Sequence, residues 1–376
     1  MSANTLRLSK HIQKFDWLLA VAMLLSSAAG LALVYTATYS YGTARYLLVQ
    51  ACAVVLGYLG MLVVSRLDYG LLLRAAPALY AAMVAALFLT ALTADTVKGN
   101  SNWLQLGSVS LQTSELMKVF FVLTLTAHLE KVGERLGELR HVLGLLLHLL
   151  LVVVPIALQK DLGMVVVYLF IFAVMLFAAG LPARYWALAL LLALPAARWC
   201  WLYLLGDYQR GRLLAAVDPN LDPLGVGYQA IQSRIAIGAG GTSGAGFLQG
   251  VQTQTSMLPE KHTDFIFSVA AEEFGLWGAL AVLVLLAFLC LRVLAAARRA
   301  KDRGGYLICM GVFASLMFQT VENIGMCLGV LPVVGLTLPL FSYGGSSVVS
   351  IYLSVGLVQA VTVRARTGSF IVEQQE

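Results

Sequence analysis

Long apolar runs separated by short polar segments dominate the pattern along the chain. Most of these runs have the ~20 residues that a helix needs to cross a bilayer. The runs cover residues 16–37, 47–65, 73–93, 115–129, 141–158, 162–180, 185–205, 268–296, 305–330 and 344–363. This pattern predicts an all-α, polytopic membrane protein with about ten transmembrane helices, in which residues 1–376 form a single integral membrane domain.

Composition supports the same class of protein. The 376 residues are 60% hydrophobic and 12% charged, and the mean hydropathy is +0.84. A soluble chain carries about 25% charged residues, so too little charge is present to cover a water-soluble globule. The formal net charge of +6 is spread over the connections between apolar runs. It therefore favours a topological signal over nucleic-acid binding.

The distribution of basic residues sets the expected orientation. An even number of spans places both termini on one side of the membrane. With the N-terminus cytoplasmic, most of the 25 Lys and Arg residues fall in segments that face the cytoplasm, as the positive-inside rule requires. We expect a multi-pass protein of the bacterial cytoplasmic membrane with both termini inside.

Residues 206–263 form by far the longest connection, and on this topology they face outward. A long loop inside a compact domain is usually functional or disordered. The stretch "GYQAIQSRIAIGAGG" at 227–241 is too apolar for disorder. We expect an extracellular loop that contains short or re-entrant helices.

Ionisable residues inside spans are costly and are therefore functional candidates. "LQTSELMKVF" at 111–120 opens the fourth span, and its Glu115 and Lys118 share a helix face because they lie three residues apart. They could form a structural ion pair or mark where a charged substrate meets the helix. Glu272, Glu273 and Glu322 lie deeper in later spans.

Two aspartates stand at the outer starts of spans. Asp161 precedes the sixth span and Asp264, in "HTDFIF", precedes the eighth. Either could simply cap a helix, a common role for Asp, and Thr263 could replace Asp264 in that role. On the predicted topology, both aspartates share the outer level of Glu115 and Lys118.

"FSYGGSS" at 341–347 opens the tenth span with two glycines and two serines. A helix start with free N–H groups is an anion site, although a plain serine cap after a tight turn explains it equally well. The five histidines and five cysteines show no metal-ligand spacing. Charged groups beside apolar grooves suit an amphiphilic substrate with a lipid tail and a polar head.

Several motifs occur in the order typical of one family. They are "GNSNWLQLGSVSLQTSELMK", "QKDLG", "YQRGRL", "DPLGVGYQAIQSRIAIGAGG", "LPEKHTDFIFSVAAEEFG" and "NIGMCLGVLPVVGLTLPLFSYGGSS". On these motifs the chain resembles the SEDS family (shape, elongation, division and sporulation), to which RodA and FtsW belong. The resemblance covers nearly the whole chain.

The resemblance implies a ten-helix fold and peptidoglycan glycosyltransferase activity on lipid II, the undecaprenyl diphosphate-linked disaccharide pentapeptide. It also implies a class B penicillin-binding protein as crosslinking partner. Asp264 matches the aspartate that the family requires. Glu115, Lys118 and Asp161 match other motif positions, and these four residues are the expected catalytic set.

The chemistry of the implied reaction assigns further roles. A sugar hydroxyl that attacks an anomeric carbon needs a general base, and Asp264 is our candidate. The departing diphosphate needs cations, either basic side chains or a divalent cation such as Mg²⁺ or Mn²⁺. We predict no protein metal ligands. The residues expected to contact the substrate are Trp103, Gln112, Arg210, Arg212, Gln229, Arg234, Lys261, His262, Thr263, Ser342, Tyr343, Gly344, Gly345 and Ser346.

The chain departs from the family pattern at several positions. Asn102 replaces an arginine, Thr113 and Lys160 replace prolines, and Glu322 stands in a span that is generally apolar in the family. Two other functions stay open: a lipid II flippase, and an inactive scaffold for the penicillin-binding protein. The motifs do not distinguish a role in elongation, division or sporulation.

Overall fold

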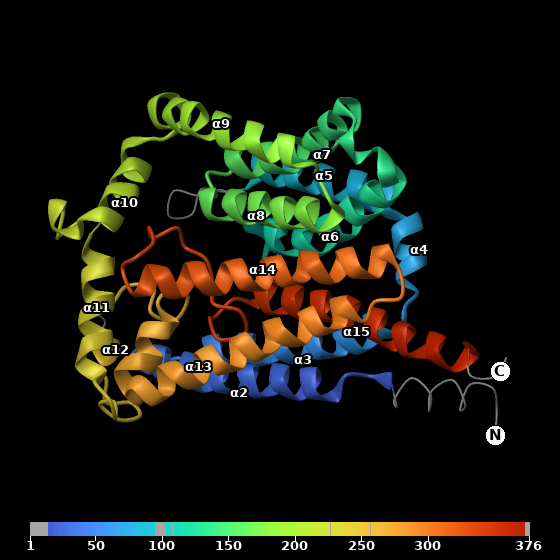
Figure 1. Ribbon diagram of the computed structural model, residues 1–376. Helices are drawn as coiled ribbons and strands as arrows, with labels where there is room; N and C mark the ends of the chain where they lie inside the picture. The colour runs from blue at the N-terminus through green and yellow to red at the C-terminus, as the bar shows by residue number, and fades with distance from the viewer. Residues whose placement is uncertain (1–13, 95–102, 107–108, 226, 256, 373–376) are drawn as a thin grey trace, which may run out of the picture.

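The computed structural model describes residues 14–94, 103–106, 109–225, 227–255 and 257–372. Its long helices run side by side in one bundle (Figure 1), and a long helix is found for every predicted span. These helices are α2 (Trp17–Tyr39), α3 (Arg45–Arg66), α5 (Ala76–Thr93), α6 (Thr113–Val132), α7 (Leu139–Leu158), α8 (Leu162–Ala179), α9 (Ala183–Trp199), α13 (Ile266–Arg298), α14 (Arg303–Cys327) and α15 (Gly345–Val372).

Nine helices in the described part of the chain are long and apolar enough to cross a membrane. The remaining predicted span, α6, has 20 residues and the same place in the bundle, but it carries Glu115, Lys118, Glu130 and Lys131. At about 1.5 Å per residue its length is still that of a spanning helix. The protein is therefore a multi-pass membrane protein with an all-α bundle.

Shorter elements join these helices. Between α9 and α13 lie η2 (Cys200–Leu204), α10 (Asp207–Val217), η3 (Pro219–Leu221), α11 (Tyr228–Gly240) and α12 (Val251–Gln254). Elsewhere are α4 (Tyr69–Arg74) and η1 (Gly133–Gly137). One feature was not predicted: β1 (Trp103–Leu106) and β2 (Val109–Gln112) form an antiparallel hairpin. The alternation of apolar and polar residues in "VSLQ" is the period of a strand.

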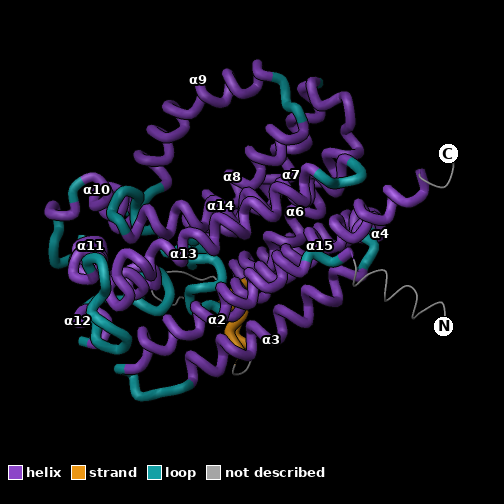
Figure 2. Tube along the Cα trace, turned by 60° about the horizontal axis from the view of Figure 1, so that its bottom comes forward, coloured by secondary structure: helices purple, strands orange, loops and turns teal. Residues whose placement is uncertain are grey.

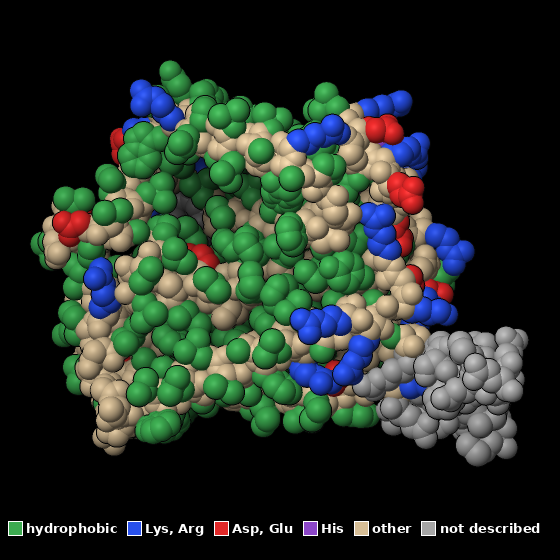
Figure 3. Space-filling model, viewed as in Figure 1, with side chains coloured by type: hydrophobic (Ala, Val, Ile, Leu, Met, Phe, Trp, Pro, Cys, Tyr) green, Lys and Arg blue, Asp and Glu red, His purple; other side chains and the backbone are tan. Residues whose placement is uncertain are grey.

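The two ends of the bundle differ. The start of α2 and the end of α15 lie together at one end, called here the terminal end, whereas α10, α11 and α12 lie at the opposite end, called the loop end (Figure 1). Lys and Arg side chains gather at the terminal end (Figure 3). This asymmetry is the one that the positive-inside rule describes for a cytoplasmic face.

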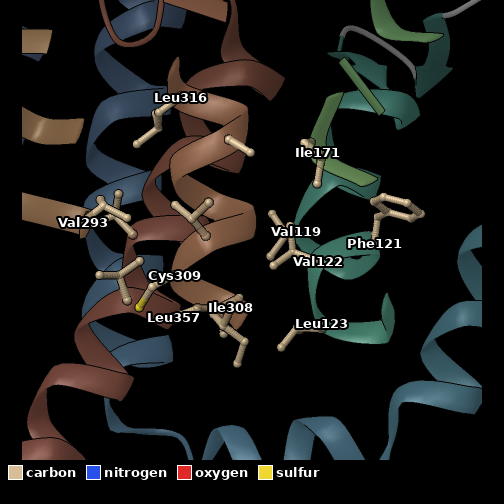
Figure 4. Close-up of a cluster of buried hydrophobic side chains, with 14 of the residues drawn as sticks. Val119, Phe121, Val122, Leu123, Ile171, Val293, Ile308, Cys309, Leu316 and Leu357 are labelled. Carbon is tan, nitrogen blue, oxygen red and sulfur yellow. The ribbon is translucent and has the colours of Figure 1, made fainter. Parts of the chain in front are cut away.

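The core is an apolar cluster between the long helices. Val119 and Val122 from α6 and Ile171 from α8 lie on one side of α14, near Ile308, and Leu316 points to the other side of α14, where Val293 lies (Figure 4). In a membrane, helix contact depends on close packing more than on water exclusion, so small residues favour it.

Glycines bring α3 and α15 together. A Cβ at Gly57 would lie 2.7 Å from the ring of Tyr352, and one at Gly356 would lie 3.1 Å from the Cα of Met61. Neither position has room for a larger side chain.

Helix α9 is the exception to this packing. None of its residues, all of which the structure describes, is buried, and the helix stands apart from the bundle at its edge (Figure 2). The surface is hollowed between α9, α10 and α14 (Figure 3). The packed core thus lies beside this hollow, which is near the loop end.

Candidate functional site

Asp264 lies just before α13 and is half-buried. Asn323 of α14 donates through Nδ2 to the Asp264 carbonyl and to the Leu336 carbonyl, both at 2.7 Å. A side chain added at Gly335 would place its Cβ 3.4 Å from Oδ2 of Asp264. The carboxylate of Asp264 therefore faces the glycine-containing connection between α14 and α15, called here the α14–α15 loop (residues 328–344).

The α14–α15 loop is fastened to the segment that carries Asp264. The backbone N–H of Tyr343 donates to the His262 carbonyl at 2.8 Å, and the hydroxyl of Ser342 donates to the Thr263 carbonyl. Gln50, fully buried in α3, donates to the Ser342 carbonyl at 2.9 Å and accepts from the N–H of Gly344 at 3.0 Å. The sequence analysis missed Gln50, although a glutamine within an apolar run was a signal.

The same loop also contacts the start of α8. A Cβ at Gly163 would lie 2.9 Å from the Val334 carbonyl oxygen. Asp161 caps α8 by accepting from the N–H of Met164 at 3.2 Å. Its other carboxylate oxygen accepts from Nε2 of Gln112 at 3.1 Å. Asp161 thus does what a helix cap does and also holds one of the predicted substrate residues.

Gln112 and Ser346 link the hairpin to α15. The N–H of Gln112 donates to the hydroxyl of Ser346 at 3.1 Å, and Trp103, half-buried, is the pairing partner of Gln112 in the hairpin. Gly345 begins α15. The structure therefore brings Asp161, Gln112 and Ser346 together at the start of α15, and it places Asp264, His262 and Thr263 against the α14–α15 loop.

Glu115 and Lys118 form an ion pair at 2.7 Å, and both side chains are buried. Lys118 also donates from Nζ to Oε1 of Gln319 in α14 at 2.9 Å. The hydroxyl of Ser350 in α15 donates to the Glu115 carbonyl at 2.6 Å. The pair consequently joins α6, α14 and α15.

Glu322 is a buried acid of a different kind. Its exposed fraction is 5%, and neither carboxylate oxygen accepts a hydrogen bond from any residue that the structure describes. Asp264 lies within electrostatic range of it. The sequence analysis noted the charge of Glu322 but not this neighbour, because positions 58 residues apart meet only in the fold.

The predicted cations have different surroundings. Arg210 donates from Nε to the Trp201 carbonyl at 2.9 Å and from Nη2 to the Leu202 carbonyl at 3.2 Å, so it closes the end of the preceding helix. Arg234 is exposed on α11, and its guanidinium lies against Gly329. Arg212 is half-buried on α10 and Gln229 half-buried on α11.

Lys261 is fully buried. Its ammonium donates to the Thr253 carbonyl and to the Ser40 hydroxyl, the latter at 3.0 Å, and lies 5.0 Å from the centre of the Tyr41 ring. Burial lowers the pKa of Lys261, and the nearby carboxylates of Glu272 and Glu273 oppose that shift. These contacts tie α2 to α12, which is a structural role.

Glu272 and Glu273 also fasten the loop end. Glu272 accepts from the N–H groups of Gln252 and Thr253 at 2.7 and 2.9 Å and from the Thr253 hydroxyl at 2.6 Å. Glu273 accepts from Gln254 at 3.2 Å. Gly275, with φ of 63°, kinks α13 just beyond them. Their position inside a span is therefore explained by the segment that they anchor.

Aromatic rings pack around His262. His262 lies 5.0 Å from Tyr46 and 5.6 Å from Tyr343, measured between ring centres. Tyr46 and Tyr343 are 5.1 Å apart. This aromatic cluster, together with the half-exposed Asp264, gives the site the mixed character of a membrane–water boundary, where such rings are enriched.

Comparison with known proteins identifies the family. A family model described as "cell cycle protein" and covering FtsW, RodA and SpoVE matches residues 16–367. "Peptidoglycan glycosyltransferase MrdB" of Escherichia coli K12 is 39% identical over 264 residues, which are 70% of this chain and 71% of the relative. A "probable peptidoglycan glycosyltransferase FtsW" of Geobacter metallireducens is 33% identical and covers 95% of this chain and 97% of its own.

Solved structures agree with the sequence comparison. A chain from a study of how a peptidoglycan synthase complex coordinates polymerization and crosslinking has a TM-score of 0.81 and 34% identity, over 93% of this chain and 98% of its own. The rod shape determining protein RodA of Thermus thermophilus has a TM-score of 0.69 and 30% identity, over 93% of this chain and 96% of its own. With this coverage in sequence and in structure, the chain belongs to the FtsW/RodA/SpoVE family, the SEDS proteins.

Proposed function

We propose that this protein is a peptidoglycan glycosyltransferase that polymerises lipid II into glycan strands at the outer face of the bacterial cytoplasmic membrane. The observation that carries the proposal is the position of Asp264. Its half-buried carboxylate lies beside Gly335 of the α14–α15 loop, and this loop also contacts the start of α8. Family relatives named as peptidoglycan glycosyltransferases support the activity.

Asp264 acts as the general base. The 4-hydroxyl oxygen of the acceptor sugar attacks the anomeric carbon of the donor, and its proton passes to the Asp264 carboxylate. The bond between that carbon and the diphosphate oxygen breaks, and undecaprenyl diphosphate leaves as an anion. Asn323 holds the backbone of Asp264 at 2.7 Å, so the base is positioned before the substrate binds.

The remaining predicted residues divide by their contacts. Asp161, Gln112 and Ser346 form a hydrogen-bonded group beside the hairpin, suited to the polar head of a lipid-linked sugar. The guanidinium of Arg234 is exposed and available to the departing diphosphate. Glu115 and Lys118 hold the helices that carry the site together, because their contacts join α6 to α14 and α15.

The topology follows from the same proposal. The loop end faces outward and the terminal end, where Lys and Arg gather (Figure 3), faces the cytoplasm, so both termini are cytoplasmic. A class B penicillin-binding protein is the partner that crosslinks the strands, in line with the peptidoglycan synthase complex among the structural relatives.

One assay distinguishes the enzyme from a flippase and from a scaffold. The protein, purified with its penicillin-binding partner, is given lipid II while the transpeptidase is blocked. Glycan strands on a gel are the expected result. Lipid II flipping in vesicles without strands would make the protein a transporter, and neither activity would leave the scaffold role.

A further inference from the structure

Gln50 is a buried polar side chain that the proposed reaction has not used. It lies near the start of α3, and its exposed fraction is 0%, whereas that of its neighbour Val49 is 39%. The amide therefore points into the bundle. An amide inside an apolar helix costs free energy unless its polar atoms are hydrogen-bonded. The groups that Gln50 binds therefore indicate its role.

Both hydrogen bonds of this amide are made with the backbone of the α14–α15 loop. Nε2 donates to the Ser342 carbonyl at 2.9 Å, and Oε1 accepts from the N–H of Gly344 at 3.0 Å. These two groups belong to the successive peptide units that flank Tyr343. One side chain of α3 thus fixes both of these peptide units.

One end of the fixed segment reaches the residues before Asp264. The N–H of Tyr343 donates to the His262 carbonyl at 2.8 Å, and the hydroxyl of Ser342 donates to the Thr263 carbonyl. These two carbonyls belong to the two residues that directly precede Asp264. The amide of α3 is therefore connected to the backbone of the proposed base through the loop alone.

The other end of the fixed segment reaches the polar group proposed for the sugar head. Ser346 follows Gly344 by two residues and accepts from the N–H of Gln112 at 3.1 Å. Gln112 in turn donates to Asp161 at 3.1 Å. Since the reacting atoms must be aligned to within a fraction of an ångström, the backbone between the base and the head-binding group has to be held still.

We propose that Gln50 is a positioning residue, which sets Asp264 relative to the group formed by Asp161, Gln112 and Ser346 by holding the backbone between them. This inference rests on the proposed function and deepens it. Gln50 is uncharged, and its hydrogen bonds go to backbone groups. Its contribution is therefore geometric, and it leaves the proton affinity of the base unchanged.

Gln359 in α15 offers a matched control. Its exposed fraction is also 0%. Its Oε1 accepts from the N–H of Asp16 and its Nε2 donates to the Asp16 carbonyl, both at 2.9 Å. Burial, residue type and the two bonds to backbone are the same as for Gln50, but the contact lies at the terminal end. Gln359→Met therefore measures the general cost of losing such an amide.

The first experiment measures the kinetics of strand synthesis. The wild type, Gln50→Met and Gln359→Met are each purified with the penicillin-binding partner and given lipid II while the transpeptidase is blocked. In Gln50→Met, kcat should fall by about 10- to 100-fold. The KM for lipid II and the acid limb of the pH–rate profile should stay those of the wild type, because neither substrate contacts nor the charge of the base change.

Gln359→Met should match the wild type in kcat, KM and pH profile. An unchanged kcat in Gln50→Met, an equal loss of kcat in Gln359→Met, or a displaced acid limb in Gln50→Met would overturn the positioning role.

The second experiment needs no turnover. Hydrogen exchange followed by mass spectrometry compares the peptides that cover residues 262–264 and 338–344. Exchange in both should be faster in Gln50→Met than in the wild type and unchanged in Gln359→Met. Gln50→Asn keeps an amide that is one methylene too short to reach both peptide units, and it replaces Gln50→Met if that variant does not fold.

Wild-type exchange in the Gln50 variants would show that Gln50 does not hold the loop, and the inference would fail. If the wild type made no glycan, the proposed function would fail, while the exchange rates still decided whether Gln50 fixes the backbone around Asp264.

Discussion

Glu115 and Glu322 are the same residue type at nearly the same burial, with exposed fractions of 3% and 5%, yet their surroundings are opposite. Glu115 has Lys118 at 2.7 Å. Glu322 has Asp264 as its charged neighbour and no hydrogen-bond donor among the described residues. A buried carboxylate with a cation beside it stabilises the bundle, whereas a buried carboxyl without a partner costs free energy if it is ionised. Burial alone does not distinguish the two roles.

Breaking the Glu115 pair should have the largest effect. In Lys118→Met, the Glu115 carboxylate stays buried without its cation, and the free energy of unfolding should fall by about 3–5 kcal/mol. Unfolding in mixed detergent measures it. The double variant Glu115→Leu, Lys118→Met removes both charges and should recover most of the loss. A double variant as unstable as the single one would mean that the pair does more than cancel charge.

Removing the unpaired acid should act in the opposite direction. Glu322→Leu replaces two carboxylate oxygens that have no hydrogen-bond partner among the described residues with an apolar side chain of similar size, so the free energy of unfolding should rise by about 1–3 kcal/mol. The same unfolding experiment measures it. Destabilisation by Glu322→Leu would show that Glu322 has a partner in the resting protein.

An ion pair outside the membrane gives the smallest effect. Arg364 hydrogen-bonds the Asp68 carboxylate and thereby lowers the pKa of Asp68 below its ordinary value of 3.8. A lowered folded-state pKa contributes stability above pH 3.8, and this contribution is lost as the pH falls through the folded pKa. Asp68→Asn should cost at most about 1 kcal/mol at pH 7, and the difference from the wild type should vanish in acid.

Much of the fold could be predicted because the bilayer imposes a simple rule on sequence. A spanning helix needs a long apolar run, and all ten predicted runs correspond to helices. The hairpin of β1 and β2 was missed because four-residue strands beside a span leave only a short alternating pattern. Its two strands are stabilised by pairing with each other, and a search for apolar runs does not predict such a pair.

The candidate site was predictable only in part. Asp161, Asp264, Glu115 and Lys118 stood out as charges at span ends. Contacts between distant positions, such as Gln50 with Ser342, had no signal in a single sequence. Lys261 had been expected near the diphosphate, but its ammonium is buried against Thr253 and Tyr41. Its charge was visible in the sequence, whereas its environment depended on how α12 packs against α2.

The most direct test of the account compares glycan synthesis by the wild type and Asp264→Asn. Each is purified with its penicillin-binding partner and given lipid II with the transpeptidase blocked. Asparagine keeps the shape of the side chain but accepts no proton, so strand synthesis should fall by about 10²–10⁴-fold while unfolding behaviour stays that of the wild type. Full strand synthesis by a folded Asp264→Asn protein would contradict the assignment of Asp264 as the base.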